Sequence, residues 1–432
     1  MYLVFYNCMW EKIQRIWKIK SLRNSILFVL GMLVIFRAVA HIPIPGVDVA
    51  ALRSFLAGNQ ILGLLNIFSG GTIENFSIAM LGVAPYITSS IIFQLLAMVV
   101  PQLEEMQKEG EAGRRRINNY TRIAAVPLAL LQAFGLIKLL GQTQTNIIPD
   151  FSAYRLAAIM ITVTAGTIFL MWIGELITER NIGNGISLLI FAGIIAALPG
   201  ALQNLLVNYN PSDLYTYIMF LVIAIVTVVG VVIISEGQRN IPVSYARMAH
   251  GAHGGYGGAQ SHLPLRVNTA GVIPIIFAIS VILFPPTVAQ FFVNSGGRLA
   301  NIARQIIYIF QNQWFYGIFY FLLVFCFTYF YTAVIFHPNK VAENLQRQGG
   351  FIPGIRPGKQ TEEYIGKTMN RIVLIGALFL GMIAILPLIL QGFTGTNSLA
   401  IGGTSLLIVV AVAIDIFKQI EAQLTMHEYD RV

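Results

Sequence analysis

Histidine and carboxylate side chains could bind a metal or transfer protons, but here they lie outside the long apolar stretches or at their ends. No HExxH spacing places two zinc ligands on one helix face, and no GxSxG motif supplies a serine nucleophile. Charged side chains inside a membrane are costly and usually functional. The charged residues closest to the apolar stretches lie near the ends of those stretches: Arg37, Lys138, Glu175, Glu236, Asp415 and Lys418. The sequence argues against a membrane enzyme and predicts no cofactor.

Three other features also fail to indicate a bound group or a processed leader. Cys8 lies near the N-terminus and Cys326 inside an apolar stretch, so neither a disulfide nor a metal site is expected. GIRPGKQT lacks the GxxxxGK[ST] spacing and follows no predicted strand, so any ATP must be hydrolysed by another protein. No cleavable signal peptide is visible, and the first long apolar stretch is expected to direct insertion.

Long apolar stretches must therefore be the elements that position any site. The chain is 56% hydrophobic and 11% charged, whereas a soluble domain is about 25% charged. Crossing a membrane takes roughly 20 mostly apolar residues. The alternative, a soluble protein, would need ten consecutive buried core helices. Ten stretches meet the length: 22–40, 77–100, 121–140, 154–174, 185–206, 214–234, 270–293, 314–336, 371–391 and 398–417.

The basic residues predict the orientation of these spans. With ten spans both termini lie on one side, and that side holds 22 of the 28 lysines and arginines. The positive-inside rule therefore places both termini in the cytoplasm. Two long loops, 101–122 and 337–371, carry much of this charge. This positive charge either sets the topology and binds anionic lipid, or it forms a docking surface for a large acidic partner.

The spans divide equally between residues 1–207 and 208–432. With five spans each, two similar halves would be inserted upside down to one another, with the functional path between them. No strong sequence repeat is visible. A solute symporter remains an alternative, because symporters also use broken helices.

Residues 61–76, ILGLLNIFSGGTIENF, begin as an apolar helix too short to cross a membrane and then break at Ser69-Gly70-Gly71-Thr72. Glycine gives such a break conformational freedom, so Gly70 and Gly71 are the predicted hinge. Irregular backbone at membrane depth persists only where protein shields it or where it lines a cavity.

Several long motifs resemble the SecY family, the pore subunits of the bacterial protein-conducting translocon. The resemblance runs from Leu22 to Leu424. It implies an all-α membrane protein with ten spans in two inverted halves, which passes unfolded polypeptides across the inner membrane and releases hydrophobic segments sideways. The motifs are FSGGTIENFSIAMLGVAPYITSSIIFQLL, KEGEAGRRRINNYTR, WIGELITERNIGNGISLLIFAGI, LPLRVNTAGVIPIIFAISVILFP, GFIPGIRPGK and GGTSLLIVVAVAIDIFKQIEAQL.

The resemblance assigns residues 61–72 to a re-entrant plug helix that closes the pore. The plug residues are Ile61, Leu64, Leu65, Asn66, Phe68, Ser69, Gly70 and Gly71. It also assigns an apolar ring, where a narrow constriction disfavours hydrated ions and offers a passing chain no fixed partner. Val83 is smaller than the isoleucine common at its place in the family, which would leave the ring slightly looser. The ring residues are Val83, Ile87, Ile190, Ile276 and Ile408.

A lateral gate between the second and seventh spans is also implied. Polar side chains across such a seam could hydrogen-bond between helices, either as a gate or as static helix contacts. The residues assigned to it are Thr88, Gln94, Thr121, Asn268 and Phe284.

The family's partners follow from the same resemblance: SecE, SecG, the SecA motor ATPase, the ribosome, the lipid bilayer, and secretory and membrane proteins with signal sequences. Docking of SecA or the ribosome is assigned to Arg356, Lys359, Arg247 and Arg239. The run MAHGAHGGYGGAQSH departs from the family, which usually carries several basic residues there. Ribosome contact through the 235–268 loop is therefore in doubt, while the 337–371 loop keeps its motif.

Overall fold

The computed structural model describes residues 16–58, 66, 69–141, 152–207, 214–245, 260–293, 297–394 and 402–429. Within them, every predicted span overlaps a helix. These helices are α2 (Lys20–Ala40), α5 (Ala84–Val99), α7 (Glu111–Gly141), α8 (Ala153–Thr178), α9 (Gly185–Val207), α10 (Leu214–Glu236), α11 (Ile273–Phe292), α13 (Gln313–Ile335), α15 (Lys359–Thr394) and α16 (Gly402–Tyr429).

Fewer helices qualify as membrane spans by length and hydropathy than overlap the ten predicted spans. Among the described residues, six helices are long and apolar enough to cross a membrane, and up to seven if α5 and α6 (Pro101–Lys108) form one bent span. Apolar segments of α9 and α11 are shorter than a full span. The chain is therefore a predominantly helical protein with several membrane-capable helices, and the count of ten remains a prediction.

The start of the second predicted span is wrong. Ser77 forms an isolated bridge with Pro43, residues 78–83 form turns rather than helix, and α5 begins only at Ala84. Gly82 adopts a φ of +56°, which a helix cannot contain, and Pro85 occupies the first turn of α5. Proline favours this position because its missing N–H would be unpaired there in any case. At the other end, Val100 is extended before Pro101, and α6 turns away by 100°.

The prediction of an all-α fold is also incomplete. A three-stranded antiparallel sheet, in the order β2-β1-β3, is formed by β1 (Gln238–Tyr245), β2 (Gln260–Arg266) and β3 (Gly350–Phe351). Its register pairs Gln238 with Arg266 and Ser244 with Phe351. Both predicted loops, 235–268 and 337–371, therefore contribute to one folded element.

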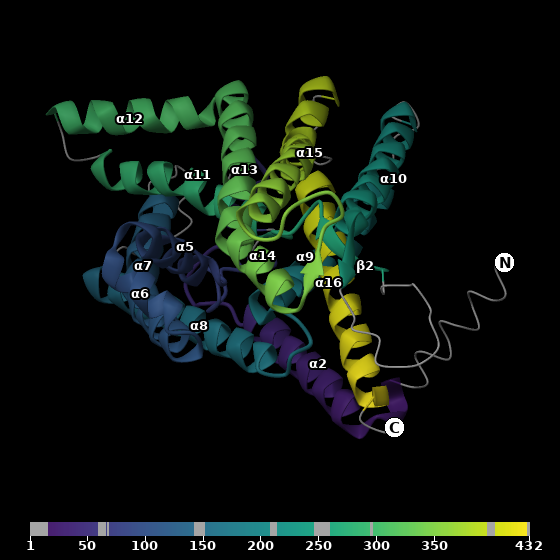
Figure 1. Cartoon of the computed structure of the whole chain (residues 1–432). Helices are drawn as coiled ribbons and strands as arrows, with labels where there is room; N and C mark the ends of the chain where they lie inside the picture. Colours follow the sequence, from purple (N-terminus) through teal and green to yellow (C-terminus); the bar gives the residue numbers. More distant parts are fainter. Residues whose placement is uncertain are drawn as a thin grey trace, which may run out of the picture.

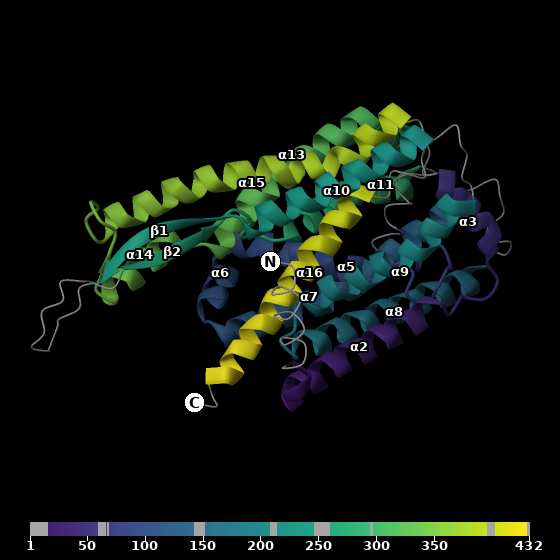
Figure 2. The same ribbon diagram turned by 90° about the vertical axis from the view of Figure 1, so that its right-hand side faces the viewer.

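Among the described residues, four helices lie outside the predicted spans: α6, α3 (Val49–Gly58), α12 (Gly297–Gln311) and α14 (Pro338–Arg347). Figure 2 shows the β1–β2 hairpin and α14 at one end of the molecule and α3 at the opposite end. The long helices α13 and α15 run between these ends (Figure 2). Figure 1 shows the blue helices α5–α8 grouped apart from the green and yellow helices α13–α16.

The buried side chains form three clusters. The largest joins α2, α5, α8, α9, α10, α11, α13, α15 and α16 at the centre of the molecule. A second packs α3 and the turns around residues 73–81 against α7 and α8. A third covers the sheet with α14 and α15. The central cluster contains the pore-ring positions that the sequence predicts.

Candidate functional site

The five predicted ring residues all belong to the large central cluster of buried side chains. Val83 directly precedes α5, and the other four lie on α5, α9, α11 and α16. All five are buried, with exposures of 0–8%. Aliphatic side chains in such a cluster exclude water and present no hydrogen-bonding group. Their role as a pore ring remains a prediction: Val83, Ile87, Ile190, Ile276 and Ile408.

The predicted plug segment, residues 61–72, is described only in part. Ile61, Leu64, Leu65 and Phe68 lie outside the described residues. Gly70 and Gly71 adopt φ angles of +80° and +77°, the left-handed region in which only glycine is free of strain. Ser69 and Gly70 are buried. The sequence break at these glycines is therefore a defined backbone turn within the protein.

Gly70 lies directly against Gly193 of α9. A Cβ placed on Gly193 would lie only 2.5 Å from the Gly70 Cα, and a Cβ on Gly70 would lie 2.8 Å from the Gly193 Cα. Because these are backbone atoms, neither position has room for a side chain. Arg37 of α2 adds a polar contact, since its Nη1 donates to the Gly70 carbonyl at 3.0 Å. Two helices therefore hold the end of the plug segment.

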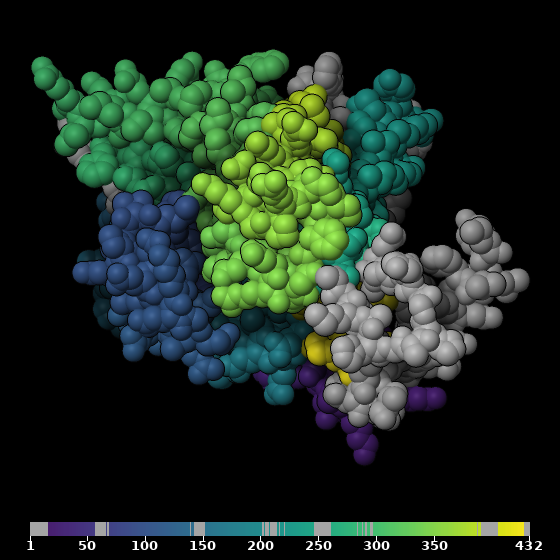
Figure 3. Space-filling view, in the orientation of Figure 1, coloured from purple at the N-terminus to yellow at the C-terminus, as the bar shows by residue number. Residues whose placement is uncertain are grey.

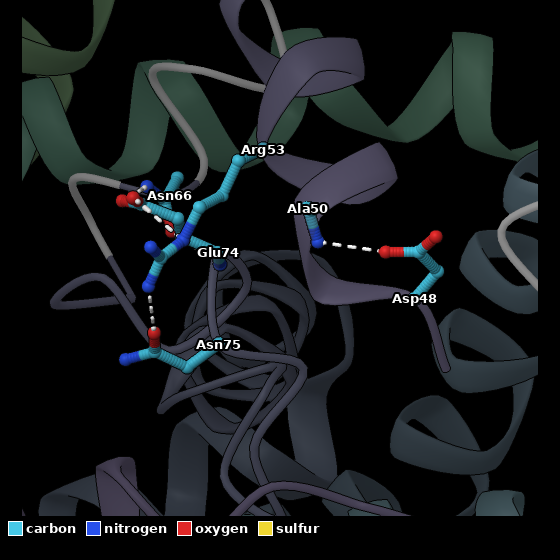
Figure 4. Close-up of polar contacts among 6 residues, drawn as sticks. All are labelled: Asp48, Ala50, Arg53, Asn66, Glu74 and Asn75. Carbon is cyan, nitrogen blue, oxygen red and sulfur yellow. Dashed lines mark hydrogen bonds and ion pairs between the residues drawn. The ribbon is translucent and has the colours of Figure 1, made fainter. Parts of the chain in front are cut away.

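Asn66 is bonded to the turn that follows the plug segment (Figure 4). Its Nδ2 donates to Glu74 Oε2 at 3.3 Å, and its Oδ1 accepts from the Glu74 backbone N–H at 3.0 Å. Arg53 of α3 ion-pairs with Glu74 at 3.3 Å and donates to Asn75 Oδ1 at 3.0 Å. Asp48 caps the same helix by accepting from the Ala50 N–H at 2.9 Å. Asn66 thus faces a neighbouring turn.

The predicted gate residues Thr88 and Thr121 bond within their own helices. Each hydroxyl donates to a carbonyl one turn earlier, Thr88 to Ala84 and Thr121 to Ile117, both at 3.0 Å. Ser89 of α5 donates to the Thr121 carbonyl at 2.7 Å and so joins α5 to α7. This contact lies beside the predicted seam and does not cross it.

Two of the remaining gate residues, Gln94 and Asn268, have side-chain acceptor oxygens without a hydrogen-bond partner. Gln94 Nε2 donates to Ser90 Oγ at 3.1 Å, but Gln94 Oε1 and Asn268 Oδ1 are buried without a partner. In the described part of the chain, no hydrogen bond joins Gln94, Thr121 and Asn268 to one another, although α5 and α11 pack together. Phe284 of α11 is 43% exposed beside Pro285 and Pro286. These residues therefore form no hydrogen bond to one another, and their assignment to a gate remains a prediction.

The turn that carries Arg356 is built as the Gly-Pro pattern predicts. Gly354 and Gly358 adopt φ angles of +83° and +98°. The Arg356 carbonyl accepts from Thr361 Oγ1 at 2.9 Å, and Thr361 is buried. The Arg356 side chain is exposed. Figure 3 shows the light-green segment that contains this turn at the centre of the visible face.

Two other predicted docking residues lie on elements that adjoin this segment. Lys359 begins α15 directly after the turn, whereas Arg239 lies at the start of β1, five residues before the Ser244 pairing with β3. Both side chains are exposed. Arg247 lies outside the described residues, as does most of the Gly- and His-rich run around it.

A family model described as SecY matches residues 77–417. Among curated relatives named Protein translocase subunit SecY, that of Halalkalibacterium halodurans is 44% identical over 98% of this chain and 99% of the relative. That of Escherichia coli K12 is 43% identical over 95% of this chain and 93% of the relative. The chain belongs to the SecY family.

Solved structures extend the likeness to the fold. This SecY-family chain superposes on a structure described as a protein conducting channel with a TM-score of 0.61, at 17% identity and 91% coverage of both chains. Sec61 in a canine ribosome-channel complex gives a TM-score of 0.59 at 16% identity, again covering 91% of both chains. SecY is a family of translocase subunits and not an enzyme family.

Several residues that contact the predicted plug segment were not identified from the sequence. Arg37 is a charged residue close to the end of a span, which is a signal of function when its partner can be named. Glu74 and Arg53 carry no motif of their own. Gly193 gave no signal either, because glycine is common in membrane helices and only the fold places it against Gly70.

Proposed function

We propose that this chain is a protein-conducting channel that passes unfolded polypeptides across the bacterial inner membrane. The observation that carries the proposal is the central cluster of buried apolar side chains, to which helices of both halves contribute and which contains all five predicted ring residues. Membership of a family of protein translocase subunits supports it. An apolar constriction suits this cargo, because it resists hydrated ions by dewetting and does not retain a passing chain.

Residues 61–72 are the plug of this channel. The contact between Gly70 and Gly193 supports this assignment. Gly193 lies on α9, three residues after the predicted ring residue Ile190. A solved SecY structure of similar fold, with a TM-score of 0.62, is described as having a plug domain that stabilises the closed state and maintains a membrane seal. In this chain, Arg37, Gly193 and Glu74 hold the segment until a substrate displaces it.

Helices α5 and α11 form a lateral gate that releases hydrophobic segments into lipid. The unpaired acceptors of Gln94 and Asn268 support this assignment, since a buried acceptor without a donor costs about 1–3 kcal/mol. That cost lowers the stability of the closed seam relative to a fully bonded one. A signal sequence that separates α5 from α11 therefore has less to overcome.

The two halves, residues 1–207 and 208–432, are inverted five-helix units with the pore between them. Both termini face the cytoplasm, as the basic residues predict. SecE clamps the halves, SecG binds beside them, and SecA or the ribosome docks on the sheet, α14 and the Arg356 turn. The ribosome-channel complex that contains Sec61 supports docking at this kind of channel.

Reconstitution in vesicles tests the proposed function directly. We expect vesicles that contain this chain with SecE, SecG and SecA to take up an unfolded secretory precursor only when ATP is supplied. Precursor that crosses the membrane becomes resistant to external protease, which is the measurement.

A matched set of vesicles without SecA separates the rival functions. Uptake of a small solute by these vesicles would identify a symporter, and turnover of a substrate would identify an enzyme. Precursor that stays protease-sensitive in the complete system, while SecA still hydrolyses ATP, would contradict the channel.

A further inference from the structure

Helix α12 (Gly297–Gln311) has three distinct faces. With 3.6 residues per turn, positions three and seven apart share a face. One face, Ala300, Ala303 and Ile307, packs on the protein, and both alanines are buried. A second face is polar and exposed: Asn301, Arg304, Tyr308 and Gln311.

The third face is apolar and yet exposed. Leu299, Ile302 and Ile309 have exposures of 59%, 53% and 44%. They lie along one side of the helix, between the face that packs on the protein and the polar face. A row of exposed apolar side chains is unfavourable in water. These three residues therefore require an apolar neighbour that is not part of the described chain.

The position of α12 identifies that neighbour. α13 runs from α12 to within three residues of α14, and its 23 residues span roughly 35 Å, about the thickness of the hydrocarbon core. α12 and α14 therefore lie at opposite membrane surfaces. Trp314 and Tyr308, at the same end of α13, are 83% and 75% exposed. Exposed Trp and Tyr are enriched at the boundary between lipid and water.

The corner between α12 and α13 is rigid. Asn312 caps α13 by accepting from the backbone N–H groups of Trp314 and Phe315 at 3.0 and 3.3 Å. The Phe310 ring packs edge-on against Phe315 and Phe319, with centroids 5.5 and 5.8 Å apart. Figure 1 shows α12 lying beside α11 and meeting the end of α13 at a corner. The orientation of α12 therefore follows that of the membrane-spanning helix.

We infer that α12 is an interfacial helix that binds the bilayer surface opposite the three-stranded sheet. Its Leu299–Ile302–Ile309 face enters the acyl boundary, and its polar face meets water. Lipid is the occupant because α13, which begins directly after α12, continues with exposed apolar side chains at Ile318 and Leu322. Those residues lie on a span, where only lipid surrounds a membrane helix that lacks a protein neighbour.

A fluorophore at adjacent positions tests this inference on the full chain. Ile302→Cys and the matched control Asn301→Cys are labelled with a polarity-sensitive dye, after Cys8 and Cys326 are replaced by serine. Each protein is inserted into phosphatidylcholine–phosphatidylglycerol vesicles. We expect dye at position 302 to be quenched by doxyl groups on the lipid chains, and quenched several-fold less by aqueous iodide than dye at position 301.

Two outcomes overturn the inference. Equal iodide quenching at both positions would place the apolar face in water. Protection of position 302 from both iodide and doxyl lipid would show that a protein covers it. Neither outcome depends on polypeptide conduction, because the vesicles contain no substrate and no motor.

Discussion

Replacing Gly193 by alanine is expected to make the resting channel leak ions. The new methyl group would lie 2.5 Å from the Gly70 Cα, and a backbone atom cannot yield as a flexible side chain does. Overpacking of this kind costs about 1–3 kcal/mol. If the cost falls on the seated plug segment alone, its displaced population rises about 5- to 150-fold. Single-channel conductance in planar bilayers, without substrate, measures the change.

Gly200→Ala is the matched control on the same helix. A Cβ at Gly200 meets nothing within 4 Å, so alanine is accommodated there. Both substitutions raise helix propensity, by roughly 1 kcal/mol. A leak confined to Gly193→Ala therefore comes from the contact with Gly70. Equal resting conductance in both variants would show that the Gly70–Gly193 contact does not close the pore.

Replacing Arg356 by glutamate is expected to lower SecA-driven translocation by about tenfold or more, the equivalent of ~1.4 kcal/mol of binding free energy. The side chain is exposed on a turn fixed by Gly354, Gly358 and the buried Thr361. Its reversal should therefore leave folding intact while it repels an acidic partner surface. Initial rates of precursor uptake at limiting SecA measure the effect.

Lys367→Glu provides the control for net charge. Lys367 is an exposed cation of α15 whose Nζ lies 3.9 Å from Glu363, and its reversal changes the net charge by the same amount. Arg356→Lys should retain part of the activity. Normal uptake by Arg356→Glu, or an equal loss in both glutamate variants, would remove Arg356 from the docking role.

The apolar stretches predicted the long helices because burial in lipid or protein demands an unbroken hydrophobic run. They could not predict where α5 begins, since residues 77–83 are as apolar as a span. Pro85 was the available signal, because proline favours the first turn of a helix. The apolar stretches did not predict α12 for the opposite reason: its arginines and polar face make it too amphipathic to qualify as a span.

The sheet was missed because pairing joins distant segments. β1 and β2 enclose a Gly-rich run, and β3 lies more than 80 residues further along the chain. Local propensity carries little information about such partners. Pro242 and Pro264, both within strands, further weaken the strand pattern.

Parts of the site were predictable only through the resemblance to SecY. Val83, Ile190 and Ile408 are ordinary aliphatic residues, and motif matching alone singled them out as ring residues. The structure places them in one large buried cluster, and their role as a ring remains a prediction. In the described residues, Gln94, Thr121 and Asn268 are not hydrogen-bonded to one another. Gln94 and Thr121 each donate within their own helix, and the Gln94 and Asn268 side-chain oxygens have no partner. Side-chain partners depend on rotamers and helix offsets that no motif encodes.

Photo-crosslinking of a stalled substrate tests the central claim most directly. A secretory precursor with a folded C-terminal block is arrested during SecA-driven uptake, with a photoreactive residue at the middle of its unfolded part. We expect crosslinks to the predicted ring positions, located by mass spectrometry: Val83, Ile87, Ile190, Ile276 and Ile408. Crosslinks confined to outward-facing residues such as Ile225, which is 56% exposed on α10, would contradict conduction between the two halves.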